Sequence, residues 1–89
     1  MLCRHYIVEG QVQGVFFRAS AQDVANNIGV KGWVRNLANG SVEVVACGTE
    51  QQLATLETWL NNGPPMAVVN RLKKADWEPT ATFTEFKIR

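Results

Sequence analysis

The chain has 89 residues, of which 46% are hydrophobic, and carries nine basic and eight acidic residues for a net charge of +1. A chain of this length can build one hydrophobic core, so we expect a single domain over residues 1–89. The charges nearly cancel and form no block of one sign, which argues against a nucleic-acid partner or a membrane surface. A small neutral or anionic ligand is the better expectation.

The residue types exclude several classes of protein. The start, MLCRH, is not followed by the apolar run of a signal peptide, and no segment approaches the roughly 18 apolar residues of a membrane span. We therefore expect a cytoplasmic protein, and a monomer. Two cysteines, Cys3 and Cys47, are too few for a zinc site of four ligands, so no metal is expected. The single histidine, His5, is expected on a strand surface and not as a ligand or base.

The first predicted element is a strand over residues 5–12. Its apolar positions recur with a period of two, which is typical of a strand with one buried face. The residues on that face are Tyr6, Val8, Gly10 and Val12.

A loop follows at residues 10–18 (GQVQGVFFR) and leads into a helix. The N–H groups at a helix N-terminus have no intrahelical partner and favour an anion. Gly14 can take positive φ, and Arg18 offers a planar fork of donors for phosphate or carboxylate. The loop holds no side-chain nucleophile, base or metal ligand, so any chemistry here must come from holding a reactive substrate. A plainer alternative is a turn glycine followed by a solvated arginine.

The next elements are a helix and a hairpin. We expect the helix over residues 21–28, with Ser20 and Asp23 forming a capping pair and Gly29 ending it. Two strand-like runs then flank Asn39 and Gly40, a dipeptide that favours a type I′ turn.

The remaining elements are a second helix and two strands. Thr49 and Gln52 match a capping box at the start of this helix, which the sequence GPP at residues 63–65 ends. A polar strand is expected from Val68 to about residue 77, and a short C-terminal strand at residues 86–88. Both strands are predicted to lie at the margins of the sheet.

The order of elements predicts an α+β fold of two layers. Two amphipathic helices need one apolar sheet face to cover, and right-handed crossovers place both helices on the same side. The expected antiparallel sheet has the order 4-1-3-2. Cys3 and Cys47 would then lie at the end opposite the loop, where a disulfide is geometrically possible, although a reducing cytosol keeps thiols free more often.

Three segments carry a family resemblance. Residues 10–18 (GQVQGVFFR), 32–36 (GWVRN) and 39–44 (NGSVEV) resemble successive motifs of the acylphosphatases. The resemblance implies a ferredoxin-like sandwich that hydrolyses the carboxyl-phosphate anhydride of acyl phosphates without a metal or cofactor. It implies inorganic phosphate as product and inhibitor.

The resemblance also implies roles for individual residues. Arg18 would bind the phosphoryl group together with the loop amides, and Asn36 would orient the attacking water. The loop residues are Gln13, Gly14, Val15, Phe16, Phe17 and Arg18. In the predicted sheet the loop and Asn36 lie at the same end, about 10 Å apart across one intervening strand.

Three alternatives remain open at this point. Asn36 could be a hairpin asparagine that bonds its own backbone. The domain could bind anions without catalysis, as a regulatory module. It could also bind single-stranded RNA, although its central strands lack paired aromatic and basic residues.

Overall fold

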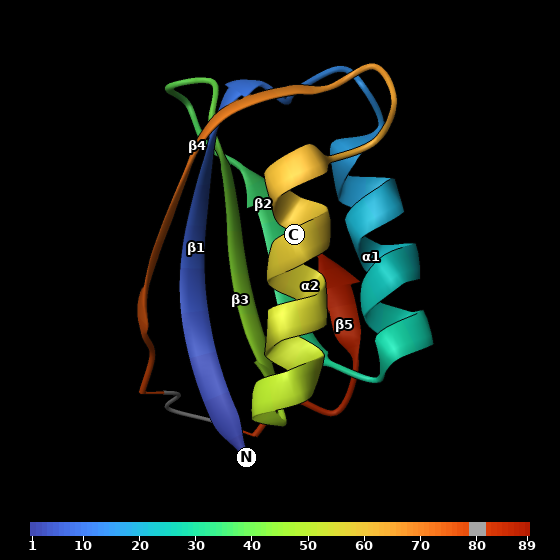
Figure 1. Cartoon of the computed structure of the whole chain (residues 1–89), viewed down its shortest axis with the longest axis vertical. Helices are drawn as coiled ribbons and strands as arrows, with labels where there is room; N and C mark the ends of the chain where they lie inside the picture. The colour runs from blue at the N-terminus through green and yellow to red at the C-terminus, as the bar shows by residue number, and fades with distance from the viewer. Residues whose placement is uncertain (79–81) are drawn as a thin grey trace.

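Five strands form one sheet, and two helices cover one of its faces (Figure 1). The structure is a computed structural model and describes residues 1–78 and 82–89. In chain order the elements are β1 (Leu2–Gln11), α1 (Phe17–Ile28), β2 (Lys31–Asn36), β3 (Val42–Gly48), α2 (Glu50–Asn62), β4 (Val68–Asp76) and β5 (Phe86–Ile88).

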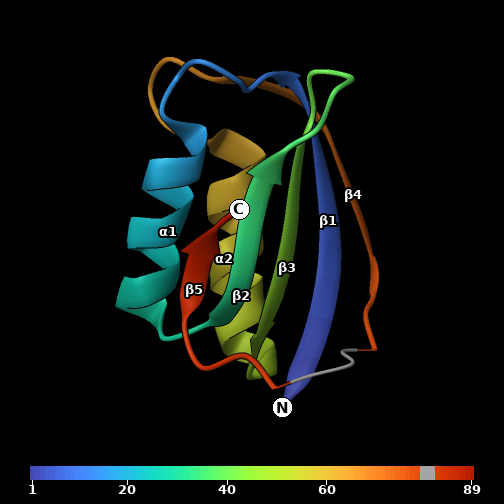
Figure 2. The same cartoon turned by 180° about the vertical axis from the view of Figure 1, so that it is seen from behind.

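The sheet has the order β4-β1-β3-β2-β5. The pairs β1–β3, β1–β4 and β2–β3 are antiparallel, and β5 adds to β2 in parallel. The predicted ferredoxin-like sandwich with the order 4-1-3-2 is confirmed, and β5 extends it by one strand. Because β1 and β2 run in the same direction, the loop after β1 and the β2–β3 hairpin lie at the same end of the molecule (Figure 2).

The core lies between the sheet and the helices. The buried face predicted for the first strand is confirmed at Tyr6 and Val8 of β1 and at Val12, directly after β1, since all three are at most 1% exposed. Facing residues from both helices and the central strands complete the core: Phe17, Ala21, Ala25, Val30, Val34, Val42, Val44, Ala46, Leu53, Leu56, Leu60 and Phe86.

A β-bulge lies near the end of β1, just before the loop. The register between β1 and β4 shifts between Glu9 and Gly10. Gly10 has a φ of 135°, and a Cβ there would lie 2.1 Å from the carbonyl oxygen of Val68. Only glycine fits this position, because both the backbone conformation and the space exclude a side chain.

The predicted start of α1 is wrong by four residues. The helix begins at Phe17, and the N–H of Ser20 donates to the carbonyl oxygen of Phe16 at 3.0 Å. Ser20 is therefore inside the first turn and is not the N-cap. The prediction of Gly29 as the left-handed end is confirmed, with φ at 97°.

The β2–β3 hairpin is confirmed, but its turn is not type I′. Gly40 has positive φ, whereas Phe16 is the only non-glycine residue with positive φ in the described part of the chain, so Asn39 does not. The N–H of Gly40 donates to Leu37, and the N–H of Leu37 donates to Ser41, which closes a loop of three residues. The Asn39 side chain accepts from the Ser41 N–H and favours this longer turn.

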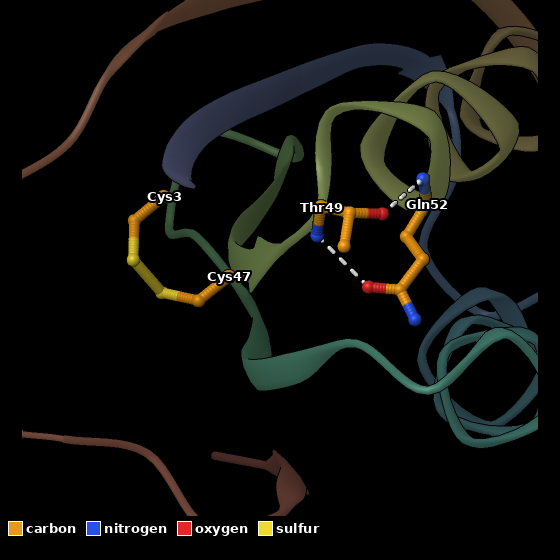
Figure 3. The surroundings of a disulfide bond; sticks show 4 residues. All are labelled: Cys3, Cys47, Thr49 and Gln52. Carbon is orange, nitrogen blue, oxygen red and sulfur yellow. Dashed lines mark hydrogen bonds between the residues drawn. A yellow bond between two sulfur atoms is a disulfide. The ribbon is translucent and has the colours of Figure 1, made fainter. Parts of the chain in front are cut away.

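The capping box predicted for α2 is confirmed (Figure 3). The N–H of Gln52 donates to the Thr49 hydroxyl oxygen at 3.1 Å, and the N–H of Thr49 donates to Gln52 Oε1 at 2.8 Å. The Gln52 amide also donates to the carbonyl oxygen of Ile28. Gln52 therefore joins the start of α2 to the end of α1.

A disulfide joins Cys3 and Cys47 (Figure 3). The two residues face each other in the β1–β3 register, with their Cα atoms 4.0 Å apart. They lie at the end of the sheet opposite the loop, and Cys47 is buried. The bond thus links the first strand to the third across 44 positions of sequence.

Glu57 of α2 connects the helix layer to two strands. Its carboxylate accepts hydrogen bonds from Arg4 at 2.7 Å, Tyr6 at 2.9 Å and Lys74 at 2.9 Å. Burial, together with the hydrogen bond to Glu57, raises the pKa of Tyr6 well above its usual range, so the hydroxyl remains a donor.

Candidate active site

A cavity of about 330 Å³ opens where β1 leads into α1. Its volume is near the lower limit for small-molecule sites. Arg18 from the start of α1 and Asn36 from the end of β2 both line it. The full lining comprises Val12, Gly14, Phe16, Phe17, Arg18, Ala19, Asn36 and Ile88. The two predicted catalytic residues are therefore brought together in one pocket.

The loop reverses direction through two left-handed residues. Gly14 has a φ of 76° and Phe16 a φ of 62°. The positive φ predicted for Gly14 is confirmed. A Cβ at Gly14 would meet nothing within 4 Å, so the backbone conformation, and not the space, favours glycine there.

The start of α1 leaves its main-chain donors available to the cavity. The first helical hydrogen bond is donated by Ser20, so the N–H groups of Phe17, Arg18 and Ala19 have no carbonyl partner within the helix. Within the described residues no side chain caps this end, and its first turn holds no acidic residue. The free donors, the positive end of the helix dipole and the Arg18 guanidinium together suit an anion.

Gln13 holds the loop to the hairpin. Its side-chain amide donates to the carbonyl oxygens of Leu37 and Ser41, each at 2.8 Å. Gln13 and Val15 are absent from the cavity lining among the described residues, whereas the other four predicted loop residues are present. The side chain of Gln13 is therefore hydrogen-bonded to the hairpin, and only its main-chain N–H could bind a ligand.

Asn36 presents an unsatisfied acceptor. Its Oδ1 atom is buried and has no hydrogen-bond partner among the described residues. Buried polar atoms are nearly always paired, so an unpaired acceptor on a residue that lines a ligand-sized cavity is a candidate contact for water or ligand. This geometry disfavours the alternative in which Asn36 bonds its own backbone.

Three lining residues were missed by the sequence analysis, namely Val12, Ala19 and Ile88. The sequence pattern predicts Val12 on the buried face of the first strand, but not in the cavity. Ile88 lies two residues after buried Phe86, so the two side chains are on the same face of β5. The position of Ile88 beside the loop depends on the parallel addition of β5 to β2, which no local pattern reveals.

Comparisons with known proteins identify the family of this chain. The family model described as Acylphosphatase matches residues 4–88. The chain belongs to the acylphosphatase family. The acylphosphatase of Pasteurella multocida (strain Pm70) is 48% identical over 89 residues, which cover 100% of this chain and 99% of the relative.

Solved acylphosphatase structures have the same fold. The crystal structure of the acylphosphatase from Bacillus subtilis is similar with a TM-score of 0.95 at 34% identity, over 100% of this chain and 99% of that one. An acylphosphatase structure from Coxiella burnetii has a TM-score of 0.93 at 40% identity, over 99% and 92% of the two chains. The family resemblance of the sequence motifs is thus confirmed.

Titratable groups on the other face of the acylphosphatase sheet form a separate cluster. His5 Nε2 lies 2.7 Å from Glu43, which also accepts from Arg35, and the His5 ring stacks on Trp77. His5 is thus a strand residue, with an acidic companion that the sequence did not reveal. Burial would raise the pKa of Glu43, but the hydrogen bonds from His5 and Arg35 lower it overall.

Two features are absent from residues 1–78 and 82–89. No three His, Cys, Asp or Glu side chains gather there in a way that could hold a metal ion. No helix there has the length and apolar character needed to cross a membrane.

Proposed function

We propose that Arg18 and the main-chain amides at the start of α1 bind the phosphoryl group of an acyl phosphate, and that Asn36 orients the water that attacks it. Membership of the acylphosphatase family makes the chain a hydrolase acting on acyl phosphates, with a carboxylate and inorganic phosphate as products. One observation carries the assignment of roles. A single cavity is lined by Arg18, by the residues at the uncapped end of α1 and by Asn36, whose buried Oδ1 has no partner among the described residues.

Binding of the phosphoryl group uses charge and direction together. The guanidinium of Arg18 can donate two parallel hydrogen bonds to phosphate oxygens, and the free amides donate from the helix end. The transition state of phosphoryl transfer is loose and spreads charge over the equatorial oxygens. Fixed donors stabilise that charge without reorganising, so this set of groups can supply most of the catalysis.

The chemical step needs little from other side chains. Asn36 Oδ1 accepts a hydrogen bond from the water and thereby directs its oxygen at phosphorus. A bond forms from water to phosphorus while the bond from phosphorus to the acyl oxygen breaks, and the carboxylate leaves with the electron pair. A phosphate oxygen of the substrate takes the water proton. A carboxylate has a pKa of about 4, so it leaves without a general acid.

Isotope labelling tests both the activity and the position of bond cleavage. The wild-type protein is incubated with acetyl phosphate in ¹⁸O-enriched water, and phosphate and acetate are analysed by mass spectrometry. We expect turnover with one ¹⁸O atom in phosphate and none in acetate, and a large loss of turnover in Arg18→Ala. Label in acetate would contradict attack at phosphorus. Phosphate binding without turnover would instead indicate a non-catalytic anion-binding module.

A further inference from the structure

Phe16 combines two features that do not favour folding. It is 81% exposed, and its backbone is left-handed, which a side chain with a Cβ rarely adopts. Exposure of a large aromatic ring forgoes its hydrophobic burial, and the left-handed conformation adds strain. Such an outlier at a site is a reason to ask what the side chain does there.

Packing of the fold does not account for Phe16. Its neighbour Phe17 is buried, and the Phe17 ring contacts Trp59 with the ring centroids 5.3 Å apart. Phe17 therefore provides the core contact at this junction. Phe16 projects from the loop and lines the cavity that also contains Arg18 and Asn36.

A second exposed apolar residue lines the same cavity. Ile88 of β5 is 41% exposed and comes from the far end of the sequence. The N–H of Arg89 donates to the carbonyl oxygen of Val34 at 2.8 Å, which holds the end of β5 against β2. The cavity thus has polar groups that can bind an anion. It also has two exposed apolar side chains that anion binding does not need.

We infer that Phe16 and Ile88 bind the acyl part of the substrate, and that this site favours acyl phosphates with an aromatic or branched apolar acyl group over acetyl phosphate. The inference rests on the proposed function, because it takes the phosphoryl group to be held at Arg18. An acyl phosphate has one charged end and one end of variable polarity. With the charged end at Arg18, an apolar acyl group would leave water by contacting Phe16 and Ile88.

The test compares two substrates that differ only in the acyl group. Values of kcat/KM are measured for benzoyl phosphate and acetyl phosphate, and their ratio is the quantity of interest. We expect the wild-type ratio to be at least about tenfold in favour of benzoyl phosphate, the order of discrimination that an apolar pocket achieves. A ratio near one would overturn the inference.

Variants then assign the preference to the two side chains. Phe16→Asn replaces the ring with a polar side chain on a residue that tolerates the left-handed conformation. It should lower the ratio of the two kcat/KM values by roughly 5–20-fold. Phe16→Leu keeps apolar bulk and should retain more of the ratio than Phe16→Asn. Ile88→Thr keeps a β-branched shape and should lower the ratio by about 2–5-fold. Leu2→Asn, an exposed apolar residue at the other end of β1, is the control and should leave the ratio unchanged.

The outcomes separate the two proposals. Hydrolysis of neither substrate by the wild-type protein would remove the proposed function, and the inference with it. Turnover of both substrates with an unchanged ratio in Phe16→Asn and Ile88→Thr would overturn the inference alone. Because the readout is a ratio within one variant, a general loss of activity does not imitate the expected result. If Phe16→Asn does not fold, Ile88→Thr and the wild-type ratio decide.

Discussion

The side-chain amide of Gln13 donates a hydrogen bond of 2.8 Å to the carbonyl oxygen of Leu37, the residue directly after Asn36. The same amide also donates to Ser41 across the hairpin. One side chain therefore fixes the loop that carries Arg18 against the strand end that carries Asn36.

Gln13→Ala should lower both stability and kcat. Loss of two hydrogen bonds costs about 1–3 kcal/mol in the free energy of unfolding, and a looser loop should lower kcat by roughly tenfold. Gln13→Glu should be worse, because a carboxylate cannot donate to the two carbonyl oxygens. Urea unfolding and steady-state kinetics measure the two effects. Gln52→Ala removes the capping box at the far end and should lower stability without changing kcat. A wild-type kcat in Gln13→Ala would contradict the role.

Arg18→Ala should weaken binding and slow the chemical step. The guanidinium contacts phosphate in the ground state and the transition state, so KM and the phosphate inhibition constant should rise while kcat falls, each by about tenfold or more. Arg18→Lys should not restore activity, because an ammonium lacks the planar fork. Steady-state kinetics with phosphate as inhibitor checks this. Arg35→Ala, on the opposite sheet face, is the matched control and should behave as wild type.

Asn36→Ala should affect catalysis without affecting phosphate binding. Placement of the water matters only as the reaction begins, so kcat should fall by about 10²–10⁴ while the phosphate inhibition constant changes little. Asn39→Ala removes the other asparagine of the hairpin and should keep kcat within a few-fold. Equal kinetics in the two variants would make Asn36 a hairpin residue only.

Reduction of the Cys3–Cys47 disulfide should lower thermal stability. The bond closes a loop of 44 residues in sequence separation, and loop-closure entropy gives about 4 kcal/mol for that length. A fall of roughly 15–30 °C in Tm is expected on full reduction. Calorimetry with and without reductant measures it, with the Cys3→Ala/Cys47→Ala variant as control. Identical Tm values in both conditions for the wild-type protein would refute the prediction.

Glu57→Gln should lower the free energy of unfolding at neutral pH. It should also make that free energy fall less than in the wild-type protein as the pH is lowered. Burial would raise the pKa of Glu57, but hydrogen bonds from Lys74, Tyr6 and Arg4 lower it below its ordinary 4.5. A lowered folded pKa means that the carboxylate stabilises the fold above about pH 4.5, and that this contribution disappears as the pH falls through the folded value. The variant should lose about 1–3 kcal/mol at pH 7.

Urea unfolding at pH 7 and pH 3 checks this dependence. The difference between wild type and Glu57→Gln should be largest at pH 7 and should shrink at pH 3. Glu50→Gln, an exposed residue at the start of α2, is the control and should change stability by less than about 0.5 kcal/mol. A difference that does not vary with pH would show that the charge of Glu57 contributes nothing.

Local patterns were enough to predict the elements and their order. The alternation of Tyr6, Val8 and Val12 and the capping box of Thr49 and Gln52 depend on neighbours a few residues away, and the structure obeys both. The start of α1 was predicted wrongly because Ser20 and Asp23 match the side-chain cap with which many helices begin. The chain instead enters the helix through left-handed Phe16 and leaves the first donors uncapped.

The candidate site needed more than local patterns. The loop and Arg18 alone predict an anion site, but the catalytic roles of Arg18 and Asn36 depend on the family resemblance, since neither residue type alone implies catalysis. The contact of Gln13 with Leu37 spans 24 positions, and Ile88 reaches the cavity only through the pairing of β5 with β2. Such contacts depend on the assembled sheet, so no window of the sequence contains them.

The order of strands also determines how the sheet meets other molecules. Its two outermost strands are β4 and β5. Along β4 the cations Arg71, Lys73 and Lys74 are exposed, and β5 is only three residues long. Lysine-rich or very short edge strands are poor templates for pairing with another chain. Two β4 edges from separate copies would bring like charges together, so the sheet resists growth by strand addition at both of its sides.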